Sequence, residues 1–127
     1  MRALRSELGR VRGLGSAREG VQHWWLQRVT AIALVPLVIW FLIGLVAHAG
    51  ADHATVTAWL GGPVTLGLFL ILLGAGLWHL ALGTQVVIED YVHREGLRLA
   101  LILLVKFGCI VLMLAGAIAL LTIAFGG

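Results

Sequence analysis

The sequence has 127 residues, of which 61% are hydrophobic and 12% are charged, and its mean hydropathy is +1.03. This composition excludes an ordinary soluble domain and indicates a protein that lies in lipid. Three membrane spans of about 20 residues each would leave little chain for a separate catalytic domain.

The basic balance of the chain, a net charge of +3, does not indicate nucleic acid as a partner. The arginines are concentrated near the N-terminus and in one later loop, where they are typical of membrane topology signals. Cys109 is the only cysteine and lies inside the last apolar run. The sequence therefore excludes an intrachain disulfide and a thiolate metal cluster.

Residues 1–22 are predicted to form a basic N-terminal tail, and residues 23–127 a membrane anchor domain. The tail contains no apolar run long enough for a signal peptide. An organellar transit peptide has a similar arginine and serine content, but Glu7 and Glu19 count against one. We therefore favour a retained bacterial tail and a location in the bacterial inner membrane.

Three apolar stretches predict an all-α membrane protein with three transmembrane helices, at residues 29–49, 63–88 and 99–125. The first contains no charged residue and would be about 31 Å long as a helix. Pro36 lies inside it and should bend the helix without ending the span.

The distribution of lysine and arginine predicts how the chain crosses the membrane. Six lie before or at the start of the first span, none between residues 50 and 62, two between the second and third spans, and none after residue 125. Under the positive-inside rule, the N-terminus and the 89–98 loop are cytoplasmic. The 50–62 loop and the C-terminus are then periplasmic.

His79 is the most informative residue of the second span, because hydrocarbon offers no water to its two ring nitrogens. It lies about 14 Å below the predicted cytoplasmic end of the helix, where a ring nitrogen can bind a haem iron between helices. A hydrogen bond between helices is the alternative explanation for a histidine at this depth.

Asp90 follows His79 by eleven residues, which amounts to about 20° beyond three full helical turns. The two side chains are thus expected on one face, with Asp90 at the cytoplasmic rim about 16 Å from His79. Tyr91 places a hydroxyl at the same rim, where it can donate to a quinone carbonyl or serve as an ordinary interfacial aromatic residue.

Two basic residues near the same side of the membrane have alternative roles. Arg28 opens the first span and can anchor the helix, or act as a fixed cation for haem propionates or for Asp90. Lys106 lies about two turns inside the third span and is expected to snorkel toward the cytoplasmic headgroups.

Two segments resemble the hydrophobic membrane-anchor subunit of succinate dehydrogenase, the smaller cytochrome b anchor or D-type subunit. Residues 27–34, Gln-Arg-Val-Thr-Ala-Ile-Ala-Leu, are similar to the Arg-x-Thr-Ala-Ile opening of the family's first span. His79, Leu82-Gly83 and residues 85–93 are similar to its pattern of His, ten residues, Asp-Tyr-Val. The resemblance covers residues 21–125.

This resemblance implies that His79 is one axial ligand of a b-type haem shared with a partner anchor subunit. It further implies that Tyr91 hydrogen-bonds a quinone, that Asp90 supports that site or its proton path, and that Arg28 faces a haem propionate. The expected partners are a second, cytochrome b anchor subunit, an iron-sulfur subunit, a flavoprotein subunit and membrane lipid. The chain would pass electrons to quinone within the complex and bind no succinate itself.

Two alternative functions remain open. One is the anchor of a fumarate reductase, since the direction of the reaction depends on the quinone and on the soluble subunits. The other is a structural or assembly subunit of a different membrane complex, in which His79 only joins helices.

Overall fold

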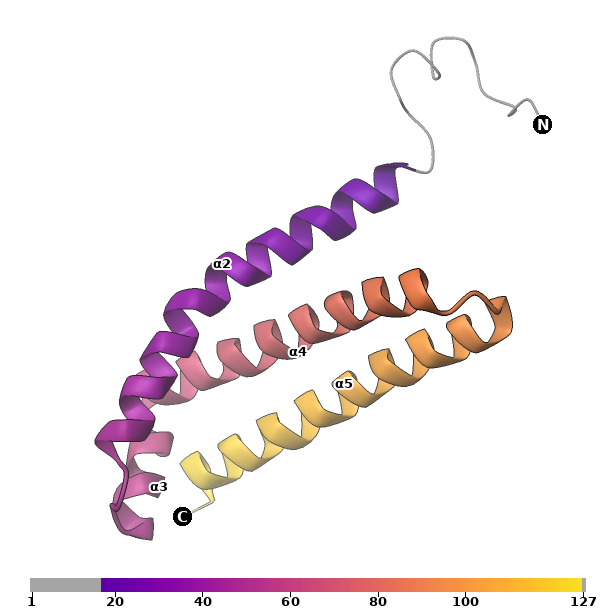
Figure 1. The fold of residues 1–127 in the computed structure, drawn as a ribbon. Coiled ribbons are helices and arrows are strands. Elements are labelled where there is room, and N and C mark those ends of the chain that lie inside the picture. The colour runs from indigo at the N-terminus through magenta and orange to yellow at the C-terminus, as the bar shows by residue number, and fades with distance from the viewer. Residues whose placement is uncertain (1–16, 127) are drawn as a thin grey trace, which may run out of the picture.

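The computed structural model describes residues 17–126, with side chains described from residue 21, and its regular structure in this range is helical. The helices, in chain order, are α2 (Ala17–Ala47), α3 (His53–Gly61), α4 (Pro63–Tyr91) and α5 (Glu95–Phe125) (Figure 1). The helices α2, α4 and α5 are long and apolar enough to cross a membrane. The prediction of an all-α protein with three membrane-spanning helices is thus confirmed.

The helices extend beyond three of the six predicted span boundaries, at residues 29, 88 and 99. Two boundaries, at residues 63 and 125, match the helix ends, and α2 ends two residues before the predicted residue 49. The helix α2 begins at Ala17, so residues 17–22 of the predicted tail are helical, while residues 1–16 lie outside the described residues. The helix α4 continues to Tyr91, and α5 begins at Glu95. Hydropathy marks only the part of a helix in hydrocarbon, because charged side chains in the headgroup region do not end a helix.

Pro36 lies inside α2 without ending it. The helix bends along its length and remains continuous (Figure 1). This agrees with the expected behaviour of a proline in a membrane helix, where neighbouring groups satisfy the backbone carbonyl that it leaves without a partner.

The central helix of the bundle is α4. It contacts α2 on one side and α5 on the other, whereas α2 and α5 do not contact each other (Figure 1). The buried residues of the described part all belong to α4: Leu66, Ala81, Leu82 and Ile88. Because most large apolar side chains of α2 and α5 are exposed, these helices need lipid or partner helices around them.

A short helix, α3, occupies most of the segment that was predicted as a loop over residues 50–62. Gly50 makes the turn before it with a φ of 81°, and Asp52 caps it by accepting a 2.9 Å hydrogen bond from the Thr55 backbone N–H. Hydrogen bonding by the Thr55 side chain, and then by its backbone, lowers the pKa of Asp52 below its ordinary value of 3.8.

An aromatic cluster attaches α3 to the long helices. The Trp59 ring of α3 stacks on His48 with a centroid distance of 4.1 Å, and it lies 5.5 Å from the ring of Phe69 in α4. Trp40 of α2 lies 5.1 Å from Phe69. Gly44 leaves room for this arrangement, because a Cβ there would collide with the Trp59 ring. We call this end of the bundle the α3 end, and the opposite end, at the turn between α4 and α5, the α4–α5 end.

Candidate functional site

The His79 ring lies between α4 and α2, where it is half-buried. Its Nδ1 is 3.0 Å from Oγ1 of Thr30, which lies 49 residues earlier in the chain. This hydrogen bond between helices is the alternative that the sequence left open for an intramembrane histidine. It involves only one of the two ring nitrogens.

The surroundings of Thr30 indicate which ring nitrogen of His79 carries the proton. The Thr30 hydroxyl donates within its own helix, to the Leu26 carbonyl at 2.8 Å, with the Gln27 carbonyl at 3.1 Å. When the single hydroxyl proton goes to one of these carbonyls, Thr30 Oγ1 accepts from Nδ1–H of His79. Nε2 then keeps its lone pair, and within the described residues it has no hydrogen-bond partner.

Two glycines of α4 lie on the same side as His79, where α2 packs. A Cβ on Gly76 would lie 3.9 Å from Leu34 Cδ2, and a Cβ on Gly83 would lie 3.5 Å from Gln27 Nε2. These contacts show that α2 runs close over α4 along this line. They lie on the side of α4 where Thr30 lies opposite His79.

Asp90 and Tyr91 end α4, which is continuous from His79 to both residues. The rise of a helix over the eleven residues from His79 to Asp90 is about 16 Å, and the two Cα–Cβ bonds differ by about 20° in direction. Both side chains at the α4–α5 end are exposed, and Tyr91 is 79% exposed. They are therefore accessible to a substrate or to a partner subunit.

Arg28 does not pair with Asp90 in the described part of the structure. Its guanidinium lies over the Trp24 ring instead, 5.4 Å from the ring centroid. Arg28 precedes Thr30 by two residues and is therefore about 3 Å nearer to the α4–α5 end than the Thr30–His79 pair. It occupies a level between His79 and the rim, and its side chain is exposed.

The described residues fit a haem to which this chain contributes a single axial ligand. A neutral imidazole with a free Nε2, held at Nδ1 by a neighbouring oxygen, is the usual form of a ligating histidine. Within residues 21–126, whose side chains are described, no group of three or more His, Cys, Asp or Glu side chains could hold a metal ion.

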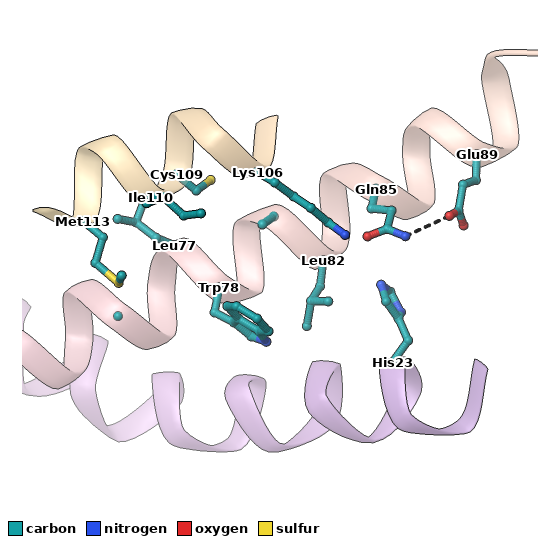
Figure 2. A pocket seen from close by; sticks show the side chains of 12 residues that line it. His23, Leu77, Trp78, Leu82, Gln85, Glu89, Lys106, Cys109, Ile110 and Met113 are labelled. Atoms are coloured by element: carbon teal, nitrogen blue, oxygen red, sulfur yellow. Dashed lines mark hydrogen bonds between the residues drawn. The ribbon is translucent and has the colours of Figure 1, made fainter. Parts of the chain in front are cut away.

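Sequence reasoning did not find Thr30 as the partner of His79, and it did not find a groove between α2, α4 and α5. The groove has a volume of about 660 Å³, and His23, Gln85, Glu89 and Lys106 are its polar lining residues (Figure 2). Lys106, expected only to snorkel, reaches along this groove toward Gln85. The periodicity of the sequence shows which residues share one face of a helix, but not which residues of different helices face each other.

The comparisons with known proteins agree with the resemblance in the sequence. The family described as succinate dehydrogenase/fumarate reductase transmembrane subunit matches residues 2–124. The chain is 39% identical to the succinate dehydrogenase hydrophobic membrane anchor subunit of Rickettsia bellii, over 91% of this chain and 92% of that protein. It is 34% identical to the subunit of the same name from Paracoccus denitrificans, over 81% and 80% of the two chains.

Proposed function

Because the chain belongs to the family of succinate dehydrogenase/fumarate reductase transmembrane subunits, we propose that it anchors a succinate dehydrogenase, ligates its haem and forms part of its quinone site. The chain is a multi-pass protein of the bacterial inner membrane. The basic N-terminal segment and the α4–α5 end face the cytoplasm in this proposal, because they carry the lysine and arginine of the flanks. The α3 end faces the periplasm.

The observation that carries the haem assignment is the bond between Thr30 and His79. It holds the imidazole by Nδ1 and leaves Nε2 free to bind a metal. At this depth in the membrane there is no water to bind Nε2 instead. A b-type haem bound there would supply one-electron transfer. In this proposal the second axial histidine comes from a cytochrome b anchor subunit.

Arg28, Asp90 and Tyr91 lie nearer to the α4–α5 end than His79 and support the rest of the assignment. Arg28 lies about 3 Å nearer to the α4–α5 end than the Thr30–His79 pair. A guanidinium at this level can bind a haem propionate in a bidentate manner. Tyr91 can donate its hydroxyl proton to a quinone carbonyl at the cytoplasmic surface, and Asp90 can accept or relay a proton beside it. Electrons would arrive from an iron-sulfur subunit docked at this end, and succinate would be oxidised on a flavoprotein subunit.

The proposal is tested by purifying the complex from membranes through an affinity tag on this chain. We expect flavoprotein and iron-sulfur subunits to co-purify, and the dithionite-reduced spectrum to contain a b-type haem band. A complex with other subunits and no such band would favour a structural or assembly role. A fumarate reductase-type anchor would be recognised by soluble subunits that reduce fumarate faster than they oxidise succinate.

The role of Thr30 as a positioning residue gives a further prediction. Thr30→Val removes the hydroxyl at nearly constant volume, and we expect haem affinity to fall about 10- to 100-fold, as for other outer partners of metal-ligating histidines. Thr30→Ser keeps the hydroxyl and should restore affinity. Haem titration of the purified variants measures the effect, and electron paramagnetic resonance of the oxidised haem reports the ligand geometry. Equal haem affinity and an identical resonance spectrum in Thr30→Val would show that the bond does not orient the ligand.

A further inference from the structure

The groove between α2, α4 and α5 lies apart from His79, because its α4 lining residues occupy a different side of the helix from the Gly76–His79–Gly83 line that faces α2. The helix α4 forms its floor, and it is open between α2 and α5 since these two helices do not contact each other. Its volume of about 660 Å³ is in the range of small-molecule sites.

The groove is polar at one end and apolar along the rest of its length. His23 of α2, Gln85 and Glu89 of α4, and the ammonium end of Lys106 from α5 meet near the α4–α5 end (Figure 2). Deeper in the bundle, the lining is apolar and includes Leu77, Trp78, Ile110 and Met113. This distribution fits an amphipathic ligand whose headgroup lies at the membrane surface.

The length of the groove matches one leaflet of a bilayer. From Gln85 to Gly74, the α4 floor rises about 16 Å, which is close to half of a hydrocarbon core of about 30 Å. An acyl chain that begins at the level of Gln85 would thus end near Gly74, about at the middle of the membrane. Glu89 lies one turn further out, at the level of the headgroup.

The charged residues at the mouth of the groove limit which kind of headgroup can bind there. Glu89 is held by a 2.9 Å hydrogen bond from the Gln85 amide, and within residues 21–126 neither Glu89 nor Lys106 forms an ion pair. The Nε2 atom of His23 is buried and has no hydrogen-bond partner in the same part of the chain. The mouth therefore presents a cation and an imidazole on the inner side and an anion on the outer side.

We propose that this groove binds a zwitterionic phospholipid with an amine headgroup, such as phosphatidylethanolamine. Its phosphate would contact Lys106 and His23, its ammonium would pair with Glu89, and one acyl chain would lie along Leu77, Trp78 and Met113. The order of charges agrees with the lipid, in which the phosphate lies deeper than the amine. A quinone headgroup fits less well, because two neutral carbonyls offer nothing to the Glu89 carboxylate.

The test uses the complex reconstituted in bilayer nanodiscs that contain phosphatidylethanolamine and phosphatidylglycerol. One probe lipid is a phosphatidylethanolamine with a photoactivatable diazirine in its acyl chain, and a phosphatidylglycerol with the same chain is the second. After irradiation, mass spectrometry locates the modified residues. We expect the ethanolamine probe to label groove residues such as Trp78 and Met113 more than exposed Phe107 and Ile118, which do not line the groove.

Three variants test the assigned charges. Lys106→Gln should weaken groove labelling by the ethanolamine probe about tenfold, since it removes a charge-assisted hydrogen bond to phosphate. Glu89→Gln should shift the preference toward the glycerol probe, because the anion that selects the amine is gone. Arg98→Gln, at the same end of α5 but outside the groove lining, is the matched control and should leave labelling unchanged.

Equal labelling of groove and outer residues would overturn the proposal. So would an unlabelled groove in a complex in which a chemical crosslinker joins a partner subunit to the groove residues. Groove labelling that is equal in wild type, Lys106→Gln and Glu89→Gln would overturn the headgroup assignment. Because the readout is lipid labelling, it remains interpretable even if the haem and quinone assignments fail.

Discussion

Replacing His79 by leucine should remove the b-type haem band from the assembled complex and leave the chain in the membrane. Leucine is compatible with the lipid phase and similar in size, so insertion should not suffer. Leucine offers no lone pair to iron. The Thr30 hydroxyl still donates to the Leu26 carbonyl after the replacement, so no donor loses its acceptor. The measurement is the reduced-minus-oxidised spectrum, expressed as haem per flavin.

His48→Leu is the matched control for this experiment. His48 directly follows the long apolar helix α2. Its Nδ1 is 2.8 Å from the Gly44 carbonyl, and its ring stacks on Trp59 at the α3 end. Its replacement should therefore leave the haem band in place. If His79→Leu retained a normal band, the histidine would serve only as a hydrogen-bonding link between α2 and α4, and the electron-transfer role would be wrong.

The number and type of the long helices could be predicted from the sequence because each apolar stretch is long enough to cross a bilayer by itself. The helix ends at residues 63 and 125 could be predicted as well. The other ends could not, since α2 begins earlier than its apolar stretch and α4 and α5 continue through charged residues such as Glu89 and Arg98. The helix α3 was missed because nine residues are too few to show a period. Its capping residue Asp52 was a signal that could have indicated it.

The alignment of His79 with Asp90 could be predicted because both residues lie on one helix, whose geometry is fixed at 100° per residue. The continuity of α4 to Tyr91 confirms the premise of that argument. By contrast, the partner of His79 belongs to another helix, and its identity depends on how α2 slides along α4. That register depends on how two helices pack against each other, which no single-helix pattern contains.

The same reason explains why the groove was not anticipated. His23, Gln85 and Lys106 come from three different helices and look unrelated in the sequence. In isolation, Lys106 reads as a snorkelling residue. In the folded chain Lys106 lies opposite α4 and lines the groove together with the Glu89 carboxylate and the buried Nε2 of His23.

Replacing Tyr91 by phenylalanine should lower succinate–quinone reductase activity about tenfold or more, and leave succinate oxidation with a soluble electron acceptor unchanged. The change removes one hydroxyl and keeps the ring, so its effect measures the donated hydrogen bond and not the aromatic packing. Steady-state assays with a short-chain quinone and with a soluble dye, on the same preparation, separate the two activities.

The competing explanation is that Tyr91 is an interfacial aromatic residue, since it is 79% exposed at the end of α4. Trp25→Phe, at an exposed position near the same end of the bundle, controls for that role and should change neither activity. If Tyr91→Phe matched this control, the hydroxyl would have no part in quinone reduction. If both activities fell together in Tyr91→Phe, the residue would instead support docking of the soluble subunits, because only a lesion upstream of quinone slows the dye reaction.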